Sequence, residues 1–185
     1  MADTAPLTKE TGPGPSPQLT NETGPRTSPR LTRDTGPALS PGARLAPFTV
    51  AVERGRLRFF GSVIGLEDTE FTSLERAREA GHHDLPVPPT FLFGLELEHQ
   101  ADAQGPDGPP VDPSRVLHTE QSFSYHETAH AGDELVFSPV ITDVYRRRAG
   151  TMEFVVRDTA VTRPDGTAIA DLHQVIMVRH PEGER

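Results

Sequence analysis

The most constraining feature of this sequence is a single, strongly apolar helical segment near its middle. Residues 85–97 read Leu-Pro-Val-Pro-Pro-Thr-Phe-Leu-Phe-Gly-Leu-Glu-Leu. Proline is tolerated at the start of a helix, because the first turn needs no internal hydrogen-bond donor. A helix that is apolar on nearly every side is predicted to be buried, so the rest of the chain has to surround it. The apolar side chains are Phe91, Leu92, Phe93, Leu95 and Leu97.

The residues around this helix carry the signals of strands, turns and two shorter helices. Helices are predicted at Glu53–Ile64 and Ser73–Ala80, and Pro164-Asp165-Gly166 is a hairpin signal. One buried helix followed by a long antiparallel meander predicts an α+β domain, in which an antiparallel sheet wraps around the central helix. The four predicted strands of the meander are Val116–His126, Leu135–Tyr145, Thr151–Thr162 and Ala168–Val178.

The N-terminal region has a different character. Residues 7–41 repeat with a period of 12, and each unit carries Leu-Thr, an acidic residue, Thr-Gly-Pro and Ser-Pro. Each unit offers little more than one leucine to bury, while ordering a residue costs about 1–2 kcal/mol of backbone entropy. We therefore predict that residues 1–46 form a disordered tail. Residues 47–181 are predicted to form the domain, and residues 182–185 a short C-terminal tail.

Composition and charge limit the partners and the chemistry of the chain. It has no cysteine, which excludes disulfides, thiolate metal sites and a cysteine nucleophile. The net charge is −9, and outside the tail it is 13 − 23 = −10, which argues against nucleic acid or an anionic membrane as partner. No apolar window is long enough to span a bilayer, and the N-terminus lacks the pattern of a secretory signal. A soluble cytoplasmic protein without cofactor or metal is expected.

Two stretches of the chain resemble a known enzyme family. In residues 48–97 a helix, a polar stretch at Gly65–Thr72, a short charged helix and a proline-rich loop lead into the apolar helix. This order resembles the N-terminal half of MaoC-like hydratases and dehydratases, which act on acyl thioesters and have a hot-dog fold. The segment 116–147, with its Ala-Gly-Asp turn before a long strand, resembles the second half of the family. The resemblance covers residues 48–179 and implies a hot-dog fold.

The catalytic motif of this family is altered in the chain. Catalytic members carry Asp-x-Asn-Pro-x-His in the polar stretch, whereas here the Asp and His positions hold Leu66 and Phe71. Neither side chain exchanges a proton, so the resemblance implies no catalytic residue in this chain. It does imply substrate contacts at Pro89, Thr90 and Phe91, where the family's central helix offers backbone N–H groups to the thioester carbonyl. Leu66 and Phe71 either line an acyl-chain channel or simply pack the core.

The family also includes two-chain enzymes, in which one subunit carries the Asp/His pair and the other binds the acyl chain. The resemblance therefore implies that this chain is the non-catalytic subunit of an (R)-specific enoyl-thioester hydratase or 3-hydroxyacyl-thioester dehydratase. Its partners would be a catalytic MaoC-like hot-dog subunit, in a heterodimer or a dimer of heterodimers, and an acyl-CoA or acyl-carrier-protein thioester. Neither nucleic acid nor a membrane is expected as a partner.

Two other functions stay open. The chain could be a hot-dog acyl-CoA thioesterase that uses Glu96 or Glu98 as its carboxylate, although a solvated helix end explains both residues more simply. It could also be a non-enzymatic protein that binds acyl thioesters.

Three other sequence features have simpler explanations than a functional site. His126-Glu127-Thr-Ala-His130 matches the zinc-binding pattern H-E-x-x-H, but it lies between predicted strands, where no long helix can form. We interpret that match as accidental. His82-His83-Asp84 is predicted to be a solvated loop, with contact to a substrate diphosphate as the alternative. Arg146–Arg148 is predicted to be a hairpin tip, with contact to coenzyme A phosphates or an acidic carrier protein as its alternative.

Overall fold

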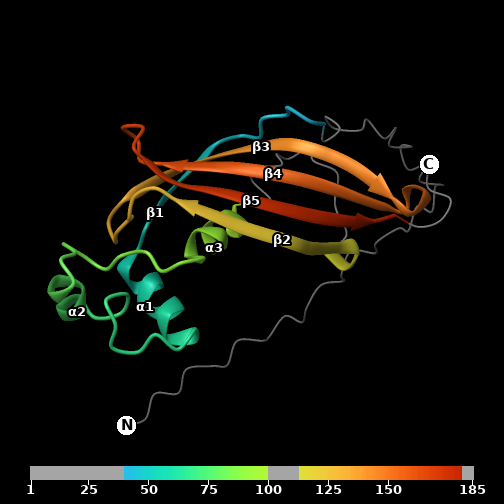
Figure 1. Ribbon diagram of the computed structural model, residues 1–185. Helices are drawn as coiled ribbons and strands as arrows, with labels where there is room; N and C mark the ends of the chain where they lie inside the picture. The colour runs from blue at the N-terminus through green and yellow to red at the C-terminus, as the bar shows by residue number, and fades with distance from the viewer. Residues whose placement is uncertain (1–39, 100–112, 181–185) are drawn as a thin grey trace, which may run out of the picture. The chain divides into compact units, whose positions relative to one another are not determined.

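The computed structural model describes residues 40–99 and 113–180. They form a five-stranded antiparallel sheet with strand order β1-β3-β4-β5-β2, as the hot-dog fold requires (Figure 1). The helices are α1 (Arg54–Val63), α2 (Leu74–Glu79) and α3 (Phe91–Glu98). The strands are β1 (Phe48–Ala51), β2 (Val116–Tyr125), β3 (Glu134–Arg147), β4 (Met152–Thr162) and β5 (Ala168–Arg179). Single 3-10 turns lie at Pro113–Arg115 and Arg148–Gly150.

The sequence pattern predicts four of the five strands and all three helices, and it misses β1. This strand is only four residues long, and it pairs antiparallel with the start of β3, so that Phe48 lies opposite Phe137. The two rings stack with centroids 4.9 Å apart. Four residues are too few for period-two alternation to stand out, so the neighbouring strand rather than the local sequence determines this element.

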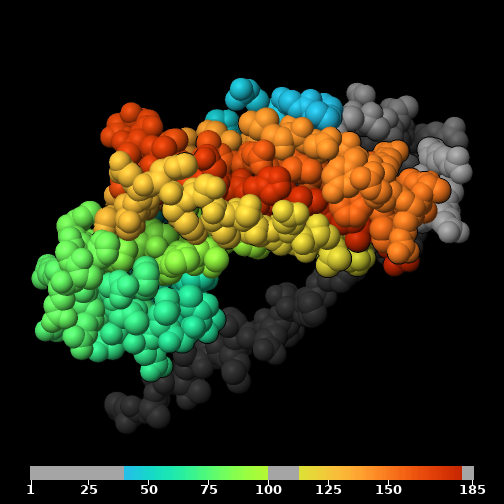
Figure 2. All heavy atoms as spheres, viewed as in Figure 1, coloured from blue at the N-terminus to red at the C-terminus, as the bar shows by residue number. Residues whose placement is uncertain are grey.

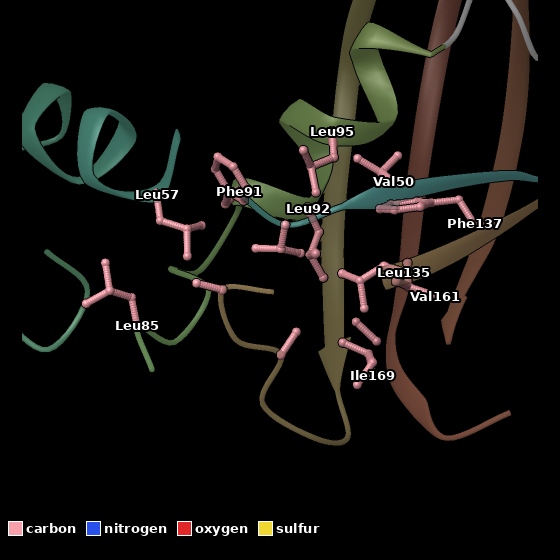
Figure 3. Packing of buried hydrophobic residues seen from close by; sticks show 14 of the residues in the cluster. Val50, Leu57, Leu85, Phe91, Leu92, Leu95, Leu135, Phe137, Val161 and Ile169 are labelled. Carbon is pink, nitrogen blue, oxygen red and sulfur yellow. The ribbon is translucent and has the colours of Figure 1, made fainter. Parts of the chain in front are cut away.

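Helix α3 packs on the inner face of the sheet, but it is not buried on every side. Phe91, Leu92 and Leu95 are buried, and they belong to one hydrophobic cluster with residues of β1, β3, β4 and β5 (Figure 3). Phe93 is half-buried, and Leu97 is 51% exposed. The prediction of a central helix against the sheet is therefore confirmed, whereas the prediction of burial all round is wrong for the last turn. A single helix covers only part of the concave sheet. Among the described residues, none buries Leu97 at the end of α3.

The domain begins before the predicted boundary at residue 47. The backbone N–H groups of Gly42 and Leu45 donate to the carbonyls of Ile141 and Pro139, at 2.8 and 3.0 Å. These bonds attach residues 42–45 to the edge of β3, a backbone interaction that composition does not reveal. The predicted disorder of residues 1–39, like the C-terminal tail, lies outside the described residues. No helix in the described part of the chain is long and apolar enough to cross a membrane.

Candidate substrate cavity

A cavity of about 300 Å³ lies where the start of α3 meets the loops before it and after β2. Its deep wall is apolar and comes from four parts of the chain: Phe71, Val87, Leu92 and Ile169. Its polar lining consists of Tyr125, His82, His126 and Glu127. An apolar cavity with a few polar groups is the usual form of a small-molecule site.

The structure brings some of the predicted substrate-binding residues to this cavity and leaves others away from it. Phe71 and Pro89 line the cavity, whereas Leu66, Thr90 and Phe91 do not. Phe91 is 5% exposed and packs edge-on against Phe60, with ring centroids 5.2 Å apart. It therefore belongs to the core.

The loop that carries Leu66 and Phe71 is held tightly against α1. Thr72 Oγ1 donates to the Leu66 carbonyl at 3.0 Å, and the Thr69 N–H donates to Thr72 Oγ1 at 3.2 Å. The loop approaches the helix at Gly61 so closely that a Cβ there would lie 2.4 Å from Thr72 Cγ2. The loop fold thus places Phe71 in the cavity wall.

The backbone donors at the start of α3 are already engaged. The Thr90 N–H donates to Tyr125 Oη at 3.0 Å, and the Phe91 N–H donates to the Pro88 carbonyl at 3.2 Å. Pro89 has no N–H to offer. The expected presentation of these N–H groups to a thioester carbonyl is therefore not seen, because protein oxygens accept both bonds.

His82 and His126 line the cavity, and the two histidines of the H-E-x-x-H match have different partners. His82 Nδ1 lies 3.0 Å from His130 Nε2, while His126 Nε2 lies 2.8 Å from Asp171 Oδ2. His126 and His130 thus have different partners, and the described residues hold no group of three or more side chains suited to a metal ion. The predicted solvated loop is wrong for His82, which lines the cavity.

His130 is the buried member of this cluster. Burial lowers its pKa, and the nearby His83 and His82 lower it further. The His130 backbone N–H donates to Asp133 Oδ2 at 3.0 Å, and Asp133 also accepts from Arg163. The sequence pattern gave no sign of this cluster, because residues 82 and 130 meet only through the packing of two loops.

Glu96 is buried, which contradicts its interpretation as part of a solvated helix end. Its side chain is 1% exposed and forms an ion pair with the 4% exposed Arg157, whose Nε lies 3.4 Å from Glu96 Oε1. Thr159 Oγ1 donates to Oε1 at 2.5 Å, and Gln174 Nε2 donates to Oε2 at 2.9 Å. Burial lowers the pKa of Arg157, and the Glu96 charge opposes this effect.

The other candidate carboxylate, Glu98, behaves as the sequence predicts. It is exposed and forms an ion pair with Arg56, with Nη2 and Oε1 2.5 Å apart. Neither glutamate lines the cavity. Neither of the two carboxylates that the thioesterase hypothesis names therefore lies at the cavity.

The geometry of sheet, central helix and cavity defines a hot-dog domain of the MaoC-like dehydratase class. The family model of the FAS1-like dehydratase domain region matches residues 40–172, and the chain belongs to this family. A UPF0336 protein of Parafrankia sp. (strain EAN1pec) is 35% identical over 130 residues, covering 68% of this chain and 80% of that protein. A UPF0336 protein of Streptomyces coelicolor is 33% identical over 96 residues, but the match spans only 63% of its length.

Solved structures of two complexes share the fold. A chain of the C-terminally truncated HadBC (3R-hydroxyacyl-ACP dehydratase) complex from Mycobacterium tuberculosis is 27% identical, with a TM-score of 0.63. That match covers 74% of this chain and 96% of the other. A chain of the ChsH1-ChsH2 complex from the same organism is 19% identical, with a TM-score of 0.61 and 77% of this chain covered, which shows the fold alone.

Proposed function

We propose that this chain is the non-catalytic, acyl-chain-binding subunit of a cytoplasmic (R)-specific enoyl-thioester hydratase or 3-hydroxyacyl-thioester dehydratase. A second hot-dog subunit, carrying the Asp/His pair, completes the enzyme. The reaction adds water across the Cα=Cβ bond of an enoyl thioester, so that the water oxygen bonds Cβ and a proton goes to Cα. The reverse reaction removes water from the 3-hydroxyacyl thioester.

The observation that carries the proposal is Phe71 in the apolar wall of the cavity. At this position a catalytic member has the histidine that exchanges protons with the water, and a phenyl ring cannot do so. What the ring does provide is apolar surface for an acyl chain, beside Leu92 and Ile169. The sequence leaves two explanations for Phe71, the wall of an acyl-chain channel or packing of the core. This arrangement favours the channel wall.

Three titratable side chains around the cavity are already paired with other side chains of the protein. His82 is hydrogen-bonded to His130, His126 to Asp171, and Glu127 forms an ion pair with Arg163, whose Nη1 lies 3.0 Å from Glu127 Oε2. These partners hold the three side chains in place around the cavity. They suit binding and orientation of a polar thioester more than proton transfer at the reacting carbons.

The sheet also offers an edge at which a second subunit can pair. β2 hydrogen-bonds β5 on one side, and no described strand pairs with its other side. Val116 and Leu117 on this strand are 37% and 56% exposed, and Tyr125 at its end is 49% exposed. An unpaired strand edge with exposed apolar side chains is a template for another sheet. The resemblance to chains of two-subunit complexes supports a hot-dog partner.

Co-purification tests the proposal. The chain is tagged in its native cell, the proteins that elute with it are identified, and the eluate is assayed for hydration of crotonyl-CoA. We expect an equimolar MaoC-like partner with an intact Asp-x-Asn-Pro-x-His motif, with activity in the complex and none in the chain alone. Hydration by a lone homodimer would refute the proposal. A chain that binds acyl-CoA but turns over nothing with any partner would instead be a non-enzymatic binding protein.

A further inference from the structure

Glu96, which forms the buried ion pair with Arg157, lies one helical turn after the cavity residue Leu92 in α3. Leu92 lines the cavity, and Leu95 and Glu96 follow it three and four residues later. Such residues share one side of a helix and are separated by about 5–6 Å along its axis. Figure 3 shows Leu92 between Leu95 on one side and Ile169 on the other. A chain that enters past Ile169 and follows α3 therefore meets Glu96 after one further turn.

Beside Glu96, the inner face of the sheet carries polar side chains. Arg157 on β4 lies directly opposite Gln174 on β5, and Gln174 lies opposite Gln121 on β2. Arg157 and Gln174 are both buried. Three neighbouring strands thus place polar side chains in one row across the inner face. Glu96 connects the helix to this row through its ion pair with Arg157 and the hydrogen bond that it accepts from Gln174.

On the basis of the function proposed above, we propose that the Glu96–Arg157 pair closes the acyl-chain channel and restricts the substrate to short- and medium-chain acyl thioesters. An acyl chain can replace leucine packing with equivalent apolar contacts, so Leu95 alone would be a weak barrier. Pushing past a buried ion pair separates two charges in a medium of low dielectric, and nothing on a hydrocarbon replaces their bonds. The pair therefore acts as a fixed end wall.

The size of the cavity agrees with this limit. Small-molecule sites commonly enclose about 300–1,000 Å³. The cavity of about 300 Å³ is at the lower end of that range. It accommodates a short chain without any change in the core, whereas a long chain needs the space that the ion pair occupies.

The test is a chain-length series on the complete complex. Values of kcat/KM for hydration are measured with crotonyl-, octenoyl-, dodecenoyl- and hexadecenoyl-CoA. Each newly buried methylene raises binding by about fourfold. We expect the wild-type value to rise from crotonyl- to octenoyl-CoA and then to fall by about tenfold or more at dodecenoyl-CoA. A value that keeps rising through hexadecenoyl-CoA would overturn the proposal.

A double variant tests the ion pair itself. Glu96→Leu with Arg157→Met replaces both charges with apolar groups of similar size, a change that buried pairs often tolerate. We expect the kcat/KM of this variant for dodecenoyl-CoA to lie within about threefold of its value for octenoyl-CoA. The gain in kcat/KM is then comparable to the contribution of one buried methylene. The matched control, Glu98→Leu with Arg56→Met, removes the more exposed ion pair that α3 forms with α1 and is expected to leave the profile unchanged. A folded double variant with the wild-type profile would contradict the proposal.

The outcomes separate this inference from the function on which it rests. If the complex hydrates no enoyl-CoA of any length, the proposed function fails. Calorimetric binding of the same acyl-CoA series to the purified chain then decides the length limit independently. Because the wild-type series needs no variant, it decides the limit even if the double variant does not fold.

Discussion

The hydroxyl of Tyr125, at the end of β2, accepts a hydrogen bond from the backbone N–H of Thr90, the residue that precedes α3, at 3.0 Å. Thr90 has a φ of +69°, in the left-handed region that non-glycine residues seldom adopt. The bond thus fixes the first turn of the central helix to the edge strand. It also occupies an amide that the family resemblance assigns to the thioester carbonyl.

Tyr125→Phe should release this amide without creating an enzyme. Both groups are at the surface, so water replaces the lost bond, and the free energy of unfolding should fall by about 0.5–1.5 kcal/mol. Hydration by the chain alone should stay undetectable, because no acid/base pair is gained. Urea unfolding and a crotonyl-CoA assay measure the two effects. The control Tyr145→Phe alters the other tyrosine, on β3, and a larger loss there would argue against the Thr90 bond.

Gly61→Ala should destabilise the chain even though alanine is the better helix former. The new methyl would lie 2.4 Å from Thr72 Cγ2 and would push the loop that carries Phe71 away from α1. Overpacking of this kind costs about 1–3 kcal/mol. Gly55→Ala on the same helix meets nothing within 4 Å and should be neutral or stabilising by up to about 1 kcal/mol. Thermal unfolding of the two variants tests this, and equal effects would refute the close approach at Gly61.

The buried His130 should make the fold less stable in mild acid. Its pKa in the folded chain is lowered by burial and by His83 and His82, while the nearby Asp133 opposes this and Arg163 adds to it. The unfolded chain therefore binds a proton at about pH 6.5, where the folded chain does not. The contribution of neutral His130 to the free energy of unfolding is therefore fully present above about pH 6.5. It is lost as the pH falls from there toward the lower pKa that His130 has in the folded chain.

Urea unfolding at pH 8 and pH 5.5 measures the effect of His130. His130→Asn should reduce the difference in unfolding free energy between the two pH values, although the variant is less stable at both because the bond to His82 is lost. His118→Gln, an exposed histidine on β2, should keep the wild-type difference. An unchanged difference in His130→Asn would contradict the account.

His82→Gln and His126→Gln should each change hydration by the complex by less than about tenfold. In the proposed function these histidines shape the cavity, and the partner subunit supplies the general acid and base. Loss of a general acid or base lowers the rate by about 10²–10⁴-fold. Steady-state kinetics with crotonyl-CoA measures both variants. A loss of a hundredfold or more in kcat, with KM unchanged, would place proton transfer in this chain.

Those parts of the fold that depend on local pattern could be predicted from the sequence. The strands β2 to β5 and the central helix have strong periodicity, and Gly132 and Gly166 mark turns with φ of +93° and +90°. β1 and residues 42–45 could not be predicted in this way, because both are held by backbone bonds to β3. Such bonds leave little trace in composition.

The candidate site was less predictable. The Leu66 and Phe71 substitutions are readable from the sequence, but the engagement of the Thr90 amide and the meeting of His82 with His130 depend on tertiary packing. The buried pair had a readable signal. Arg157 and Thr159 lie between Val155 and Val161 on the inward side of β4. A charged residue on that side needs a buried partner, and Glu96 is that partner.

The most direct test of the central claim compares one substitution in each subunit of the purified complex, with crotonyl-CoA as substrate. Replacing the histidine of the partner's Asp-x-Asn-Pro-x-His motif with alanine should lower kcat by about 10²–10⁴-fold. Phe71→Ala in this chain should raise KM and leave kcat within about threefold, because it removes contact with the acyl chain in the ground state and the transition state alike. A collapse of kcat in Phe71→Ala, with the partner variant still active, would show that this chain performs the chemistry.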